Sequence, residues 1–134
     1  MSAPAVAGSA DGKRFIVAWK DIRTGEPNVY WATSVGPSFT RDALLHEDTT
    51  GEQNYPSLAV EPSGTAWAVW VDKRPGRQRV WARSSTESDK GQEVSEQADG
   101  AVDYPVVASG AGLVGIVYEA KKDGKNVVMF RLLR

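Results

Sequence analysis

The sequence predicts an all-β protein built from three successive sheets. The first observation behind this is an internal repeat: WKDIRTGEPNVYW, which begins at Trp19, returns as WVDKRPGRQRVWA from Trp70. The second is that short apolar runs alternate with glycine, proline and Asp-Gly turn signals throughout the chain. The third is that no stretch keeps the 3.6-residue period of a helix. A repeat of about 50 residues with short strands is typical of a β-propeller, in which each repeat forms one blade.

Three copies of the repeat share anchor residues in one register. Each has a proline, an alanine, an aromatic residue, a glycine and a valine in that order, namely Pro4, Ala7, Trp19, Gly25 and Val29; Pro56, Ala59, Trp70, Gly76 and Val80; and Pro105, Ala108, Tyr118, Gly124 and Val128. We therefore expect one domain of three blades, at about 3–50, 51–100 and 101–134. A β-sandwich with accidental internal similarity is the alternative.

Each copy has sequence for up to four strands. The first follows the proline, as in PSLAV, because the first residue of a strand need not donate a ladder hydrogen bond. The second, FIVAW or TAWAVWV, is nearly all apolar, as expected for a strand covered on both faces. The third is NVYWATS or RVWARSS. A weaker fourth strand is expected in ALLHE from Ala43 and in EVSEQ from Glu93, and the third blade is expected to lack it.

The turn between the second and third strands carries an Asp and an Arg in two of the three copies. Asp21 with Arg23, and Asp72 with Arg74, are expected to pair with each other or bond loop amides, and so to staple the turn. The third copy has alanine and lysine at these positions and cannot form this pair. The alternative is that the two arginines line a pocket and bind an anion.

Composition excludes several classes of function. The formal net charge of −1 gives no general attraction for nucleic acid or an anionic membrane. The absence of cysteine excludes disulfides, Cys-ligated zinc and a cysteine nucleophile. One histidine, His46, leaves little for a metal site or a Ser–His–Asp triad. We expect no metal, no cofactor, no nucleic-acid partner and no membrane partner.

The line W-x-D-x-R-x-G, followed by the aromatic-rich strands VYWATS and VWARSS, resembles the bacterial sialidase-like, BNR-type β-propeller repeat. The Asp-box of that family, roughly S-x-D-x-G-x-[ST]-[WF], survives only in part. Copy one has Ser34 where the Asp belongs, and copy two keeps Asp89 and Gly91 but not the end of the motif. The resemblance is thus to a degenerate member. It implies a six-bladed fold and a secreted, periplasmic or cell-surface location, although no signal peptide opens this chain.

True sialidases combine a three-arginine cluster, a Tyr–Glu nucleophile pair and an acid/base Asp. Only Arg23 and Arg74 occupy matched loop positions here. Tyr55 and Tyr104 each precede the repeat proline, which favours a packing role over a nucleophile. The acidic residues that remain are expected to be solvated loop residues: Glu47, Asp48, Glu52, Asp99 and Asp103. No catalytic residue is assigned.

Three blades cannot close a ring, since propellers typically have about 4–8. An open stack would leave an apolar sheet face bare at each end, and such patches mark interfaces. Two chains give six blades, so we predict a two-fold homodimer that closes the ring. The alternative is that the chain is half of a longer polypeptide.

The predicted function is a non-catalytic binding or scaffold module for a carbohydrate or a protein partner at the central funnel. The expected ligand-binding residues are Arg23, Asn54, Tyr55, Arg74, Asp103 and Tyr104. Two alternatives stay open: a sialidase-like glycoside hydrolase, and a purely structural half-propeller with no ligand of its own.

Overall fold

The computed structural model describes residues 2–74, 76–86, 88–96, 98 and 100–133. These residues form strands, turns and irregular loops and include no helix, so the all-β prediction is confirmed. Asp99 lies outside the described residues. The strands form three antiparallel sheets that follow one another along the chain.

The three sheets take their strands in sequence order. The first sheet contains β1 (Ala5–Gly8), β2 (Phe15–Asp21), β3 (Asn28–Val35), β4 (Ser38–Phe39) and β5 (Ala43–Leu44), where both β4 and β5 pair with β3. The second contains β6 (Gln53–Val60), β7 (Ala66–Asp72), β8 (Arg79–Ser84) and β9 (Gln92–Glu93). The third contains β10 (Asp103–Gly110), β11 (Leu113–Lys122) and β12 (Lys125–Leu132).

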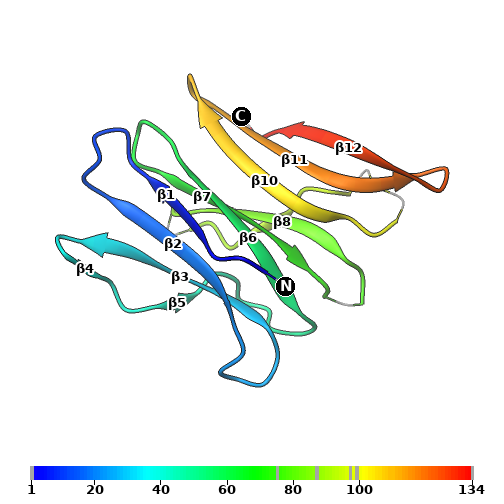
Figure 1. The fold of residues 1–134 in the computed structure, drawn as a ribbon, viewed down its shortest axis with the longest axis horizontal. Helices are drawn as coiled ribbons and strands as arrows, with labels where there is room; N and C mark the ends of the chain where they lie inside the picture. The colour runs from blue at the N-terminus through cyan, green and yellow to red at the C-terminus, as the bar shows by residue number, and fades with distance from the viewer. Residues whose placement is uncertain (1, 75, 87, 97, 99, 134) are drawn as a thin grey trace.

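The sheets are arranged side by side, from blue through green to red in Figure 1, with the second between the other two. Two strand predictions need correction. The fourth strands shrink to the two-residue β5 and β9, and β4 was not anticipated. Asp89 closes the turn before β9, because its carboxylate accepts hydrogen bonds from the amides of Ser84 and Gly91 (both 2.8 Å). Burial raises the pKa of Asp89, but hydrogen bonds from Ser84 and Gly91, together with the charge of Arg83, outweigh it and the net pKa is lowered.

The second sheet explains why its middle strand is so apolar. All seven residues of β7 are buried, because the first sheet covers one face and the third covers the other. Trp70 packs towards Ile16 and Ala18, whereas Val69 packs towards Ile116. Two contiguous cores therefore exist, one at each sheet–sheet interface.

The first strand of the first sheet, β1, follows its proline as predicted, but β6 and β10 begin before theirs, and each of these two strands contains a bulge. Tyr55 and Pro56 together oppose the single residue Trp70, and Tyr104 and Pro105 oppose Tyr118 in the same way. Proline has no N–H to give to the ladder, so the extra residue lets pairing resume beyond it. The tyrosines adopt a left-handed backbone, with φ of 54° and 51°.

His46 has a structural place in the core between the first two sheets. It is 2% exposed, its Nε2 accepts a hydrogen bond from the amide of Val29 (3.1 Å), and its Nδ1–H donates to the carbonyl of Asp48 (2.9 Å). In the second sheet Ser95 performs the same task, since its Oγ accepts from the amide of Val80 (2.9 Å). Burial lowers the pKa of His46, so the folded protein holds a neutral imidazole.

This arrangement predicts a stability change between about pH 7 and pH 5. Below the ordinary histidine pKa of about 6.5, the unfolded chain takes up a proton that the folded chain resists. The free energy of unfolding should therefore fall as the pH falls through this window. Because His46 is the only histidine, the decline should vanish in His46→Ser, which copies the Ser95 arrangement. Urea unfolding at pH 7.5, 6.5 and 5.5 checks this; an equal decline in the variant would show that another group is responsible.

Candidate functional site

The Tyr–Pro bulges bring two of the predicted binding residues together. The rings of Tyr55 and Tyr104 meet edge to face, with centroids 5.5 Å apart and an interplanar angle of 73°. Tyr104 is 55% exposed. A left-handed backbone costs a non-glycine residue about 1–3 kcal/mol, and such strain gathers at functional positions. The bulges therefore hold two aromatic rings where regular strands would not present them.

A shallow pocket of about 220 Å³ lies at these rings. It is lined by residues just before β1 and by residues near the start of β6 and β10: Ala3, Pro4, Tyr55, Pro56, Tyr104, Pro105 and Val106. The amide of Tyr55 donates to Ser2 Oγ (2.8 Å), which ties the start of the chain to this end of the molecule. We call the pocket the tyrosine mouth.

A second pocket of about 260 Å³ continues from the tyrosine mouth, since Tyr104 lines both. It lies between the second and third sheets, and Asp103 and Glu119, which face each other in the β10–β11 ladder, both line it. The rest of the lining is Gln78, Ala101, Val102, Ala120, Lys121 and Asn126. We call it the side pocket. Beyond Gln78 and Ala101 a further hollow runs towards Arg77.

The turns at this end show what the repeated Asp and Arg do. In the second sheet Asp72 accepts hydrogen bonds from the indole N–H of Trp70 (2.9 Å), the amide of Arg74 (3.0 Å) and the Arg74 guanidinium (2.6 Å). The guanidinium lies over the ring of Trp81, 4.1 Å from its centroid. Asp72 is fully buried and also accepts from Gln53 Nε2 (3.2 Å).

The first sheet repeats this arrangement nearer the surface. Asp21 accepts from Trp19 Nε1 (3.1 Å) and from the amide (2.8 Å) and guanidinium (2.6 Å) of Arg23, which stacks on Tyr30 at 4.2 Å. The guanidinium holds the pKa of the Asp21 carboxyl well below its usual range. Arg23 also pairs with Asp42 (2.7 Å). We call each set of four residues a turn staple: Trp19, Asp21, Arg23 and Tyr30 in the first sheet, and Trp70, Asp72, Arg74 and Trp81 in the second.

The third sheet has no turn staple, and the side pocket opens there. Ala120 stands where the other sheets have Asp21 and Asp72, and Lys122 stands where they have arginine. Ala120 lines the side pocket. The side pocket therefore opens at the corner where the third sheet lacks the carboxylate and the arginine of the turn staple.

The structure thus divides the predicted ligand-binding residues into two groups. Tyr55, Tyr104 and Asp103 gather at the connected pockets. Arg23 and Arg74 belong to turn staples and line neither pocket. Asn54 is half-buried next to Tyr55, and its buried Oδ1 accepts no hydrogen bond from the described residues.

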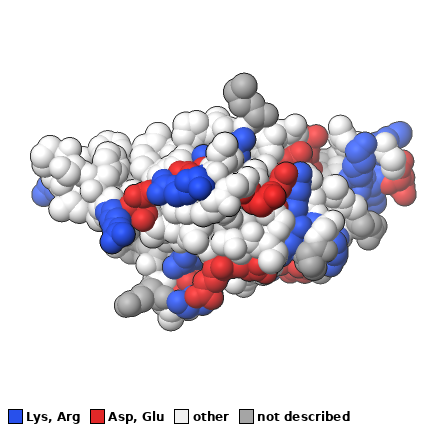
Figure 2. All heavy atoms as spheres, turned by 90° about the horizontal axis from the view of Figure 1, so that it is seen from below, with Lys and Arg blue, Asp and Glu red and all other residues white. Residues whose placement is uncertain are grey.

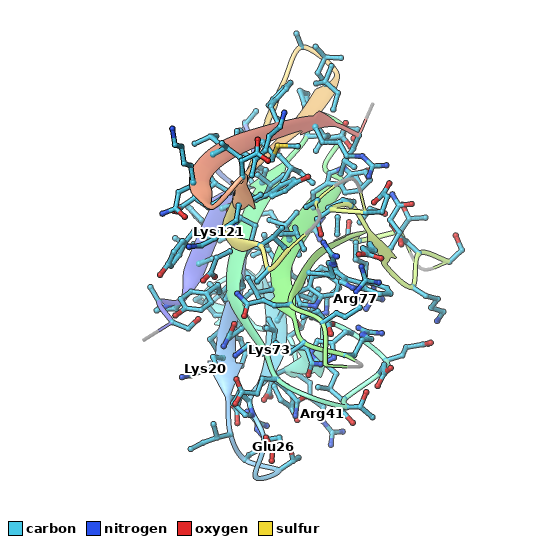
Figure 3. All side chains as sticks on the ribbon, turned by 90° about the vertical axis from the view of Figure 1, so that its right-hand side faces the viewer. Lys20, Glu26, Arg41, Lys73, Arg77 and Lys121 are labelled. Carbon is cyan, nitrogen blue, oxygen red and sulfur yellow. The ribbon has the colours of Figure 1, made fainter. Side chains whose placement is uncertain are left out.

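Four polar residues of the side pocket were not among the predicted ligand-binding residues: Gln78, Glu119, Lys121 and Asn126. A signal for them existed, because the third copy departs from the repeat here. Glu119 replaces Lys20 of copy one and Val71 of copy two. Figure 3 looks onto this end of the molecule, where Lys20, Lys73 and Lys121 come from the ends of β2, β7 and β11.

Surface charge and possible metal ligands also bear on the function of the site. Acidic and basic side chains are interspersed on the face seen in Figure 2, with no field of one sign. Within the described residues, no group of three or more His, Cys, Asp or Glu is placed to hold a metal ion. In the same part of the chain, no helix has the length and apolar character to cross a bilayer.

No protein-family model and no curated protein sequence matches the chain. The solved structures similar to it include an α-L-arabinanase of Penicillium chrysogenum complexed with arabinobiose (TM-score 0.62, 13% identity), a GH43 endo-arabinanase of Bacillus licheniformis (0.55, 15%) and an endo-1,4-beta-xylanase of Bacteroides thetaiotaomicron (0.56, 18%). They match 96%, 97% and 97% of this chain and 41%, 50% and 48% of their own chains, respectively.

The chain thus spans about half the length of the proteins it resembles, or less. At this identity the likeness concerns the fold, and it supports the predicted relation to β-propellers. The sialidase-like subtype remains a prediction.

The burial of Asp72 predicts that the two turn staples differ in their effect on stability. Asp72→Ala removes the carboxylate from a buried ion pair and should lower the free energy of unfolding by about 3 kcal/mol. Asp21→Ala removes the same contacts nearer the solvent and should cost clearly less. Urea denaturation of both variants measures the difference; equal losses would contradict the role given to burial.

Proposed function

We propose that this chain is a non-catalytic β-propeller binding module that takes up a carbohydrate at the tyrosine mouth and the side pocket. The observation that carries the proposal is the position of Tyr104. An exposed aromatic ring lies at the junction of the two pockets, beside carboxylate, amide and ammonium groups.

This combination suits a sugar better than an anion. Aromatic rings offer an apolar face with a polar tip, and sugars expose C–H faces that pack on such rings. Asp103 and Glu119 accept hydrogen bonds from hydroxyl groups, while Gln78, Asn126 and Lys121 supply donors. The two arginines that would favour an anion are bound in turn staples instead.

The fold likeness supports a first choice of ligands. The similar solved structures include arabinanases, one of them with arabinobiose, and a xylanase. Oligosaccharides of arabinose and xylose are therefore the first class to test. Sialylated glycans form the second class, because of the resemblance to sialidase-like repeats.

A second candidate function, glycoside hydrolysis, is favoured by one observation. Asp103 and Glu119 lie opposite each other in adjacent strands and line one pocket, and most glycosidases use two carboxylates. Release of reducing sugar from arabinan or xylan, or cleavage of a fluorogenic sialoside, would establish it if Asp103→Asn and Glu119→Gln abolished the turnover. Such a result would replace the non-catalytic role.

The binding proposal predicts a selective effect of the exposed tyrosine. On a glycan array followed by calorimetry with the bound glycan, Tyr104→Ala should weaken binding at least tenfold, because it removes the stacking surface. The matched control is Phe39→Ala, which removes an aromatic ring of similar exposure (51%) on β4, away from both pockets. It should bind like the native protein. Absence of glycan binding, or equal binding by Tyr104→Ala, would refute the proposal.

A further inference from the structure

The two contacts between sheets are made by equivalent faces of the repeat. The first sheet contacts the second through Ala18 and Val29, and the second contacts the third through Val69 and Val80. These are equivalent positions of the repeat, because Val29 and Val80 are its anchor valines. We call this side of every sheet its leading face and the opposite side its trailing face.

The leading face of the third sheet is apolar but uncovered. The equivalents of Val69 and Val80 are Val117 and Val128, and Val128 is 74% exposed. Val106, Val117 and Phe130 lie side by side across β10, β11 and β12, so the exposed residues form one continuous surface.

This surface has one large aromatic side chain, as the equivalent packed face of the second sheet does, but the aromatic residue is on the neighbouring strand. The second sheet has the large residue Trp67 on its middle strand and the small Ala82 on the next strand. At the equivalent positions the third sheet has Gly115 and Phe130. The Phe130 ring lies over Gly115, where an added Cβ would come within 3.0 Å of it. The aromatic volume has therefore moved to the neighbouring strand, as in a face that still packs against a partner.

The trailing face of the first sheet is the matching surface at the other end of the stack. The second sheet uses Leu58, Ala66 and Trp70 on its trailing face to cover the first sheet. The equivalent residues of the first sheet are Val6, Phe15 and Trp19. Val6 is 65% exposed and Phe15 is 46% exposed. Figure 1 shows the first and third sheets at opposite ends, and Figure 2 shows a broad uncharged area at the end formed by the first sheet.

We infer that the occupant of both surfaces is a second copy of this chain: the leading face of the third sheet in each copy packs on the trailing face of the first sheet in the other. The template is internal, since the molecule makes the same leading-to-trailing contact twice within itself. Two copies give two such seams and a closed ring of six sheets, which lies within the usual propeller range of about 4–8.

The second copy also completes the tyrosine mouth. Within one chain, Tyr55 of the second sheet lies beside Tyr104 of the third. Ala3 is the residue of the first sheet that precedes its repeat proline, so it is the equivalent of both tyrosines. At the seam, Ala3 and Pro4 of the second copy therefore come next to Tyr104. This part of the inference rests on the proposed function, whereas the assembly itself does not.

The mass in solution tests the assembly independently of any ligand. Light scattering during size-exclusion chromatography should give twice the 14.5 kDa of one chain, without further growth as the concentration rises. Val128→Glu and Val6→Glu each place a charge in both seams and should each give the mass of a single chain. Ile22→Glu is the control, because Ile22 is equally exposed (64%) but lies in the β2–β3 turn.

A mixing experiment tests the direction of the contact. Val128→Glu keeps an intact first sheet and Val6→Glu keeps an intact third sheet, so an equimolar mixture should recover a two-chain species through one intact seam. Circular dichroism and urea unfolding establish that each variant is folded. A native protein that stays a single chain at about 100 μM, or that grows into longer polymers, would overturn the inference. So would a Val6→Glu variant that remains a dimer, because the third sheets would then pair with each other.

Discussion

The fold depends on the need to cover both faces of a narrow apolar sheet. β7 shows the requirement fulfilled, since each of its residues is buried between the flanking sheets. Hydrophobic burial contributes about 25 cal/mol for each Å² of apolar surface removed from water, so such a strand is stable only with a sheet on either side. The first and third sheets have the same residue pattern, but within one chain only one face of each is covered by another sheet. The stability of the sheets and the repeat architecture thus have one physical origin, and the proposed self-association would follow from the same requirement.

The turn staple shows how one repeated motif stabilises a turn in two sheets, while its absence from the third sheet coincides with a pocket. Where Asp72 is present, it collects hydrogen bonds from an indole, an amide and a guanidinium, and the arginine lies flat on Trp81. Where Ala120 replaces the Asp, the same corner becomes a pocket with a different set of polar groups. A position where one copy departs from the repeat is informative, because the structural role that fixes the residue in the other copies no longer applies there.

The tyrosine mouth has a different origin, in backbone strain. In β6 and β10 the repeat proline removes a ladder donor, and the bulge that compensates leaves the preceding tyrosine with a positive φ. Glycine would adopt this conformation without cost. The presence of tyrosine in two of the three copies therefore favours a use for the ring itself, and the contact between Tyr55 and Tyr104 places both rings at one pocket.

The sequence by itself determined the all-β class, the three repeat units and the residues of the turn staples, because these follow from local pattern and spacing. Only the tertiary structure decided which polar residues meet. Gln78 precedes β8 of the second sheet whereas Asn126 lies in β12 of the third, and Glu119 faces Asp103 only through the register of β10 and β11. Sequence also could not separate Arg74, bound beneath its own turn, from Tyr104, exposed at the mouth. That difference depends on burial and on contacts between distant strands, which no local pattern contains.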